Sequence, residues 1–248
     1  MTTPDPSAPQ LSLSGVRATI TLSRPDEHNR IDPADIPHLM RCLDAVERQK
    51  DLRVLVITGT GSRTFSSGYT LTAILTHLDS SFEDLLDRLE NFPLPTLCAL
   101  NGSVYGGGTD LALCCDFRIG VKGSRMFVPA ARFGLHYYPG GLRRFTSRLG
   151  PGATKKIFLT CLPLHDEEML RVGFLTELVP AEELAASVAT YVQALTEAEP
   201  SVVLSMKRHI DRLALGDSDP SLGQHDYQAS LRSEELAHRL AEVRPVRR

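Results

Sequence analysis

The sequence predicts an α/β fold, because short apolar runs with a strand pattern alternate with segments of helical periodicity in the first part of the chain. The predicted strands lie near residues 11–22, 53–58, 95–100, 115–120 and 126–128. The predicted helices among them lie near residues 34–49, 70–91 and 107–114. After about residue 139 the pattern is mostly helical, and it includes three further predicted helices over 181–197, 200–214 and 222–241.

Length and composition fit one substantial core with a smaller appended region. At 248 residues, with 42% hydrophobic and 23% charged residues, the chain is long enough to bury one large core. We expect a disordered tail over residues 1–10, a core over 11–195 and a helical region over 196–248. The net charge of -3 predicts no nucleic-acid partner, and no apolar run approaches the ~20 residues of a membrane span.

The cysteines and histidines point to a reducing compartment and to no metal. Five cysteines without a C-x-x-C spacing predict a cytoplasmic protein without disulfide bonds. Cys114 and Cys115 lie in an apolar run, so we expect small buried side chains rather than redox groups. The eight histidines show no metal-ligand spacing, and we predict no metal site.

Two glycine-bearing segments carry the functional signal. The first, residues 65–68, follows the apolar run 54–57, and the second, residues 101–108, follows the run 94–100. Each pattern is typical of a strand-to-helix turn, where backbone N–H groups lack partners within the helix. Two such turns aimed at one point form an oxyanion hole for a thioester carbonyl that becomes enolate-like, and glycine lets the substrate approach the backbone.

The ordered motifs resemble the crotonase (enoyl-CoA hydratase/isomerase) superfamily over roughly residues 11–240. Besides Phe65-Ser66-Ser67-Gly68 and Asn101-Gly102-Ser103-Val104-Tyr105-Gly106-Gly107-Gly108, the resemblance includes Asp116-Phe117-Arg118-Ile119, Gly134-Leu135, Gly140-Gly141-Leu142-Arg143-Arg144 and residues 173–179. It implies a spiral of strand-strand-helix repeats with a C-terminal helical trimerisation region, and hence a homotrimer or a dimer of trimers. It also implies an acyl-CoA thioester as substrate, with coenzyme A as part of that substrate and no permanently bound cofactor.

The resemblance also implies a coenzyme A subsite. The segment from Arg24 to Asn29 matches the family's Arg-Pro-x-x-x-Asn motif, which lines the adenine end of coenzyme A. Arg24 or Arg30 is the candidate cation for the coenzyme A phosphates, and a solvated surface arginine is the alternative. The other residues expected at the thioester carbonyl and the coenzyme A are Ser67, Gly68, Tyr69, Leu71 and Gly106. A nucleophilic Ser67 is disfavoured, because no G-x-S-x-G elbow surrounds it.

Asp110 is the candidate acid/base. It lies three residues after Gly107, so on a helix both fall on the same side. The family usually carries a glutamate at this position, and some isomerase-type members carry an aspartate. The position of the family's second glutamate is Ala130, whose methyl group cannot transfer a proton, so two-glutamate hydration is not expected. The alternative for Asp110 is a structural carboxylate in the first helical turn.

The loop of His136, Tyr137 and Tyr138 borders the acyl pocket in the resemblance. His136 and Tyr138 are candidate catalytic groups, because histidine titrates near neutrality and tyrosine can donate a hydrogen bond to an enolate. In relatives that isomerise dienes or displace aryl halides, a catalytic aspartate occupies the position of Tyr138. The alternative is that this aromatic cluster only fills and shapes the pocket.

The sequence therefore predicts an enzyme, a lyase or isomerase of the enoyl-CoA hydratase/isomerase type. In it, the amides of Ser67 and Gly107 hold a thioester enolate, and Asp110 moves a proton at the α- or γ-carbon. The alternatives are C–C bond cleavage or decarboxylation, which need no second glutamate, and a non-catalytic acyl-CoA binding protein. An unrelated phosphate-binding loop is disfavoured, because no Lys-Ser/Thr pair follows the glycines.

Overall fold

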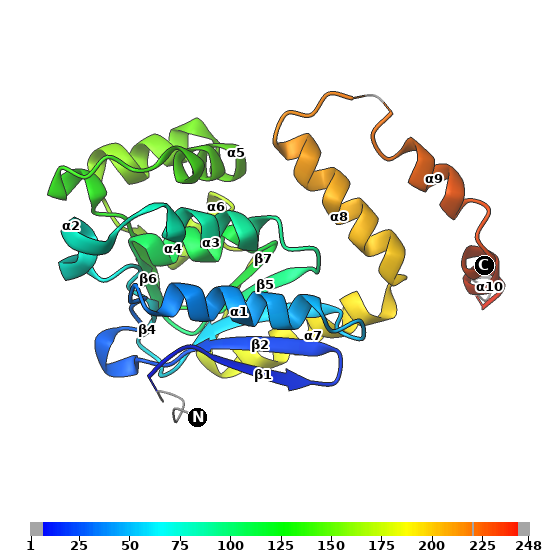
Figure 1. Cartoon of the computed structure of the whole chain (residues 1–248), viewed down its shortest axis with the longest axis horizontal. Helices are drawn as coiled ribbons and strands as arrows, with labels where there is room; N and C mark the ends of the chain where they lie inside the picture. The colour runs from blue at the N-terminus through cyan, green and yellow to red at the C-terminus, as the bar shows by residue number, and fades with distance from the viewer. Residues whose placement is uncertain (1–6, 220, 243–248) are drawn as a thin grey trace. The chain divides into compact units, whose positions relative to one another are not determined.

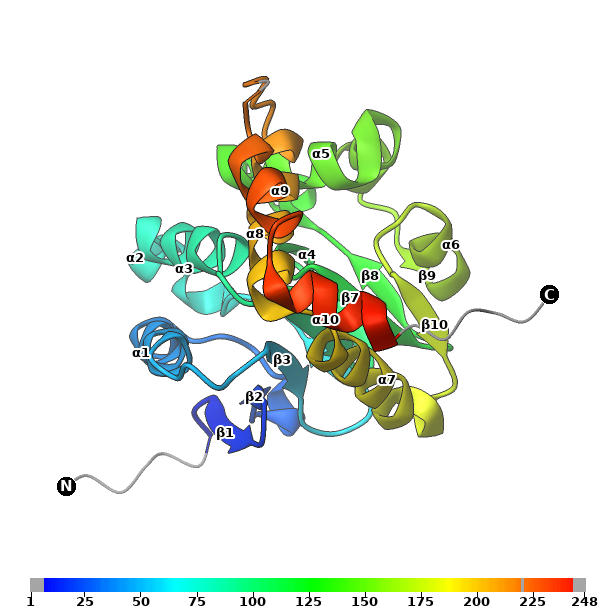
Figure 2. The same cartoon turned by 90° about the vertical axis from the view of Figure 1, so that its right-hand side faces the viewer.

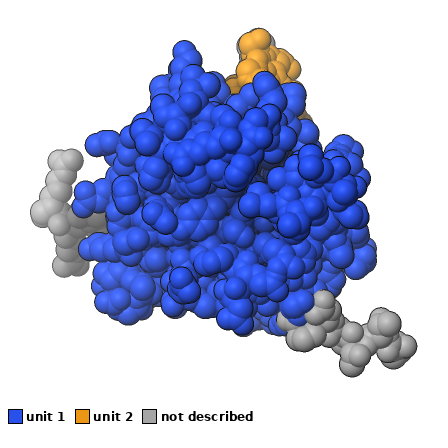
Figure 3. Space-filling view, turned by 90° about the vertical axis from the view of Figure 1, so that its left-hand side faces the viewer, with its two compact units in different colours: residues 1–196 blue, residues 197–248 orange. Residues whose placement is uncertain are grey.

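The computed structural model describes residues 7–219 and 221–242. The chain divides into two compact units, residues 1–196 and 197–248, which Figure 3 colours separately. Residues 1–6 of the predicted tail lie outside the described residues, and the first strand begins at Gln10.

A six-stranded sheet forms the centre of the first unit, in the order β1-β2-β3-β5-β7-β10. Its strands are β1 (Gln10–Ser14), β2 (Arg17–Leu22), β3 (Val54–Gly59), β5 (Thr96–Leu100), β7 (Phe117–Val121) and β10 (Glu177–Val179). All neighbours pair in parallel except β1 and β2, which form an antiparallel hairpin. The single strand predicted over residues 11–22 is therefore wrong, because Gly15 adopts a φ of 56° and reverses the chain there.

A second, four-stranded sheet consists of β4 (Thr64–Ser66), β6 (Ser103–Tyr105), β8 (Arg125–Phe127) and β9 (Leu164–His165). The first three are parallel to each other, and each directly follows a strand of the larger sheet along the chain. The chain thus forms a spiral, in which each turn adds one strand to the larger sheet and one strand to the smaller sheet before a helix follows. The strands β4, β6 and β9 are not predicted from the sequence, because segments of two or three residues are too short to show a strand period.

Helices cover both faces of the larger sheet. The helices of the first unit are α1 (Asp35–Glu47), α2 (Ile74–His77), α3 (Ser80–Glu90), α4 (Gly107–Cys114), α5 (Pro139–Lys155), α6 (Asp166–Arg171) and α7 (Leu184–Glu197). Figure 2 shows α1 and α7 on opposite sides of β3. Val54 and Val56 of β3 face Val188 of α7, whereas Leu55 and Ile57 belong to the main core on the other side. Burial on both faces explains why β3 is a continuous apolar run.

The helix predicted over residues 70–91 is interrupted. A short 3-10 turn (Leu71–Ala73) and α2 precede a break at Asp79, whose carboxylate accepts the amide of Ser81 and caps α3. The four apolar side chains of α3, Phe82, Leu85, Leu86 and Leu89, are all buried. Helix α3 lies beside α4 within the first unit (Figure 1).

In the described part of the second unit, residues 197–219 and 221–242, the helices are α8 (Pro200–Ala214), α9 (Gln224–Ser230) and α10 (Glu234–Glu242). The prediction of a helix over 200–214 is confirmed, whereas the predicted helix over 222–241 is two helices separated by a turn. Apolar side chains of this unit that are exposed in the single chain include Met206, Ile210, Leu213, Tyr227, Leu231 and Leu240. Trimerisation through this region stays a prediction. Within the described ranges, no helix combines the length and the apolar character needed to cross a membrane.

Candidate active site

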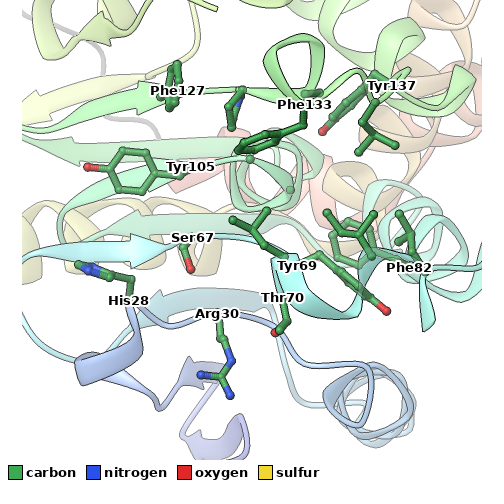
Figure 4. Close-up of a pocket in the computed structure, with 18 of the residues that line it drawn as sticks. His28, Arg30, Ser67, Tyr69, Thr70, Phe82, Tyr105, Phe127, Phe133 and Tyr137 are labelled. Carbon is green, nitrogen blue, oxygen red and sulfur yellow. The ribbon is translucent and has the colours of Figure 1, made fainter. Parts of the chain in front are cut away.

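A cavity of about 1010 Å³ opens in the first unit. Figure 4 shows one wall with His28, Ser67, Tyr69 and Thr70, and a facing wall with Tyr105, Phe127, Phe133 and Tyr137. On the first wall, Ser67, Tyr69 and Thr70 follow β4, and His28 follows β2. On the facing wall, Tyr105 ends β6, Phe127 ends β8, and Phe133 and Tyr137 follow β8, so successive turns of the spiral supply the two sides.

The two glycine turns meet at this cavity. Gly68 adopts a φ of +80°, and a Cβ atom at this position would lie 2.5 Å from the amide nitrogen of Gly107. The hydroxyl of Ser66 accepts the Gly68 amide at 3.0 Å and donates to the carbonyl oxygen of Asn29 at 2.8 Å. Only glycine therefore allows the turn after β4 to approach the N-terminus of α4 so closely.

The structure corrects one of the two predicted amide donors. The amide of Ser67 donates to the carbonyl oxygen of His28 at 2.8 Å, so it is already engaged. The amide of Ile31 donates to the carbonyl oxygen of Gly68, and the amide of Thr70 donates to the carbonyl oxygen of Ile31. The N–H of Tyr69 therefore points away from Ile31.

Tyr69 and Gly107 instead present a pair of backbone donors. Within the described part of the chain, neither amide has a hydrogen-bond acceptor, and both residues line the cavity. A Cβ atom at Gly107 would lie 3.4 Å from the amide nitrogen of Tyr69, so the donors are neighbours. The sequence could not reveal this, because it depends on the bridge between Ile31 and Tyr69.

Asp110 lies behind the cavity wall rather than in it. Its side chain is fully buried, and it accepts the hydroxyl of Tyr138 on one oxygen and Arg144 on the other, the latter at 2.6 Å. Tyr138 lines the cavity, and Asp110 is absent from the lining residues that the structure describes. The expectation that Asp110 faces the acyl group is therefore corrected, and its contacts support the alternative of a structural carboxylate.

The groups around Asp110 form a buried polar cluster. Arg144 is fully buried and also pairs with Asp87 at 2.8 Å and Glu90 at 3.1 Å. Burial raises the pKa of Asp110, although the charge of Arg144 and the hydrogen bond from Tyr138 oppose this change. Burial also raises the pKa of Tyr138, so its phenol stays protonated and acts as a hydrogen-bond donor.

The loop of His136, Tyr137 and Tyr138 lies at the cavity, as the sequence suggested. Tyr137 is buried, stacks on Tyr138 with ring centroids 4.6 Å apart, and packs against Phe158 at the same distance. The Tyr137 hydroxyl has no hydrogen-bond partner among the described residues. His136 is exposed, with its Nδ1 atom 2.7 Å from the carbonyl oxygen of Tyr137. All three residues thus border the cavity, and Tyr137 also fills the space between Tyr138 and Phe158.

Cationic side chains gather at one part of the cavity wall. Arg30 lines the cavity and pairs with Asp32, with Nε 2.8 Å from the carboxylate. Arg24 lies outside the cavity and is held by Asp35, with one guanidinium nitrogen 3.1 Å from its carboxylate. Arg63 and Arg125 also line the cavity and were missed, because their positions follow from the pairing of the short strands. The guanidinium of Arg125 lies 5.9 Å from the ring centre of Tyr105.

The structure brings most of the predicted residues together. Those that line the cavity are Arg30, Ser67, Tyr69, Leu71, Gly106, Gly107, His136 and Tyr138. Arg24, Gly68 and Asp110 do not line it. Glu83 of α3 lines it and was missed, because the helical pattern marks only the apolar neighbours of this residue. In the described ranges, no cluster of three or more His, Cys, Asp or Glu side chains is suited to hold a metal ion.

Comparison with known proteins defines the family. A family model described as "Enoyl-CoA hydratase/isomerase" matches residues 14–231. The chain is 25% identical over 219 residues to a short-chain-enoyl-CoA hydratase of Clostridium acetobutylicum, covering 86% of this chain and 84% of that protein. It is 30% identical over 203 residues to a carnitinyl-CoA dehydratase of Salmonella enteritidis, covering 79% and 77%. The chain therefore belongs to the enoyl-CoA hydratase/isomerase family.

Solved structures agree at the level of the fold. The crystal structure of an enoyl-CoA hydratase from Bacillus anthracis superposes with a TM-score of 0.83 at 21% identity and covers 94% of each chain. The expected crotonase-like α/β fold is thus confirmed.

Proposed function

We propose that this protein is an acyl-CoA enzyme that stabilises a thioester enolate at the amides of Tyr69 and Gly107. The observation that carries the proposal is this pair of neighbouring donors, which have no partner among the described residues and lie at the wall of a large cavity. Donors fixed before the reaction stabilise the charge that develops on the carbonyl oxygen, at no cost in reorganisation. Family membership and relatives named for coenzyme A thioesters support the same substrate class.

The coenzyme A end of the substrate fits the cationic part of the wall. His28, Arg30, Arg63 and Arg125 line it, and three of them are permanent cations. Arginine binds phosphate oxygens through two parallel hydrogen bonds, which suits the phosphates of coenzyme A. The acyl group then extends toward the apolar side chains of Phe82, Phe133 and Leu135.

The reaction that fits best is the movement of a proton at the α- or γ-carbon. Ala130 lines the cavity at the position of the second family glutamate, and Asp110 lies behind Tyr138. Hydration by two carboxylates is therefore not expected, because neither position presents a carboxylate to the cavity.

We further propose that the protein forms a homotrimer or a dimer of trimers and is located in the cytoplasm.

The test combines binding with chemistry. Saturated, 2-enoyl and 3-enoyl thioesters of coenzyme A are titrated calorimetrically and then incubated with the protein in D₂O, and mass spectrometry and NMR follow each thioester. We expect binding, a lower carbonyl stretching frequency of the bound thioester, and deuterium exchange or double-bond migration without addition of water. The matched control is the same acyl group on a short thiol without the nucleotide, which is expected to bind more weakly.

Each other outcome has a distinct meaning. Binding without a shift of the carbonyl frequency would refute the assignment of the two amides. Rapid addition of water to an enoyl thioester would refute the proposal that the protein does not catalyse hydration. Tight binding with no change in any thioester would favour the non-catalytic acyl-CoA binder, which the buried position of Asp110 makes the second candidate.

A further inference from the structure

We propose that Glu83 is the catalytic carboxylate of this cavity and moves a proton between the α- and γ-carbons of an enoyl thioester. The inference rests on the proposed function and assigns its proton-transferring group. Glu83 stands on α3, an element that supplies neither of the two family glutamate positions, which fall at Asp110 and Ala130.

The position of α3 brings Glu83 to the cavity. Its neighbour Phe82 packs against the start of α4. A Cβ atom at Gly107 would lie 2.9 Å from the Phe82 ring. The ring centroids of Phe82 and Tyr69 are 5.4 Å apart, and Figure 4 shows both side chains at the same end of the cavity. Glu83 follows Phe82 directly and lines the same cavity.

Glu83 also lies near Tyr138 at the start of α5. A Cβ atom at Gly140 would lie 3.5 Å from a carboxylate oxygen of Asp87, 3.9 Å from one of Glu83 and 3.9 Å from the ring of Tyr138. The absence of a side chain at Gly140 leaves this space between α3 and Tyr138 open. Glu83 and Tyr138 both line the cavity, as do Tyr69 and Gly107.

The Glu83 carboxylate is available for chemistry, unlike its acidic neighbours. It has no hydrogen bond or ion pair with any residue that the structure describes. Asp87 and Asp110 are bound to Arg144, and Glu90 is bound to Arg143 and Arg144. Asp79 lines the cavity as well, but its carboxylate caps α3.

The surrounding charges prepare Glu83 for proton transfer. Burial is the largest cause that raises its pKa, and the negative charges of Asp87, Asp84 and Asp110 raise it further, while Arg144 lowers it. Asp84 and Asp87 act from its own helix, Asp110 from α4 and Arg144 from α5. A carboxylate with a raised pKa is a stronger base, closer in strength to the carbon acid that it must deprotonate.

The proposed step needs no other reactant. The Glu83 carboxylate takes a proton from C2 of a 3-enoyl thioester, and the C–H electron pair forms an enolate whose oxygen is held by the amides of Tyr69 and Gly107. The protonated Glu83 then returns the proton to C4. The double bond moves from C3–C4 to C2–C3 and the carbonyl re-forms, so nothing is oxidised or reduced. One carboxylate is sufficient, which agrees with alanine at position 130.

The experiment compares Glu83→Gln with Glu182→Gln, which removes an equal charge by the same substitution from an exposed residue that does not line the cavity. We expect Glu83→Gln to slow double-bond migration and deuterium exchange by about 10²–10⁴-fold. Its affinity for a saturated acyl-CoA should stay unchanged, and Glu182→Gln should keep wild-type rates. Glu83→Asp should restore part of the activity.

The pH profile provides a second readout. The wild-type rate should fall as the pH drops through the raised pKa of Glu83, and Glu83→Gln should lack this limb. Unchanged migration in folded Glu83→Gln would overturn the inference. Wild-type protein that binds enoyl-CoA but moves no proton would also overturn it and leave the binding assignment intact. Absence of any acyl-CoA binding would instead overturn the proposed function itself.

Discussion

The substitution Gly68→Ala tests whether the site needs the close approach of the turn after β4 to the start of α4. Alanine at this position adds a Cβ atom that would lie 2.5 Å from the amide nitrogen of Gly107 and 2.6 Å from that of Gly108. Both neighbours are backbone atoms at the start of α4, so the atom cannot be accommodated by a rotamer change. One of the two turns must move by nearly 1 Å to reach ordinary van der Waals contact at about 3.4 Å.

Two costs add in Gly68→Ala. The φ of +80° costs a residue with a side chain about 1–2 kcal/mol. Overpacking against a fixed backbone costs about 1–3 kcal/mol more. A displacement of about 1 Å between the amides of Tyr69 and Gly107 should also lower turnover by about 10²-fold.

Gly123→Ala is the matched control. Gly123 has the same φ of +80°, and a Cβ atom there would meet nothing within 4 Å. It should therefore show the backbone cost alone and keep wild-type turnover. The free energy of unfolding from urea titration and the rate of exchange in D₂O measure the two effects. If Gly68→Ala is no less stable and no less active than Gly123→Ala, the close approach of the turns has no role in the site.

Three further predictions concern groups around the cavity. Tyr137→Phe removes a buried hydroxyl without a described partner, so urea denaturation should show stability that is unchanged or higher by up to about 1 kcal/mol, and a clear loss would reveal a partner. Burial raises the pKa of Glu90, but its bonds to Arg143 and Arg144 outweigh this and leave the pKa below 4.5. Glu90 should thus contribute to the free energy of unfolding above pH 4.5, and this contribution is lost as the pH falls through the lowered pKa. The urea midpoint of Glu90→Gln should lack this loss, and the same pH dependence in the variant and the wild type would contradict the role of Glu90. Arg125→Ala should weaken binding of acyl-CoA about twofold to fivefold at low salt and less at high salt, and calorimetry that finds no change would exclude a phosphate contact.

The sequence was sufficient for the fold class and for the location of the cavity. The apolar runs of β3, β5 and β7 are continuous because both faces are buried, and the glycines after them mark the turns that line the site. The hairpin at Gly15 and the short strands β4, β6 and β9 were not predictable, since each depends on a single turn residue or on two or three residues of pairing.

The details of the site depend on contacts between distant segments. Ser67 and Tyr69 lie two residues apart in one turn, and only the pairing with His28 and Ile31 decides which amide remains available. Asp110 matches a family acid/base position, yet Tyr138 from a later segment covers it. Glu83 carries no motif and becomes a candidate only when α3 packs against α4. In each case the deciding contact spans tens of residues and leaves no local pattern.

The spiral also determines when the oxyanion pair can exist during folding. The amides of Tyr69 and Gly107 become neighbours only after β4 and β6, which are separated by a complete turn of the chain, are in register. Long-range pairing of this kind is slow to form, because the chain must lose the entropy of loop closure before the paired strands stabilise it. A partly folded chain can therefore bury much of its core and still have no thioester site. The acyl-CoA ligand proposed above would bind only the completed site and would therefore stabilise the native state by mass action.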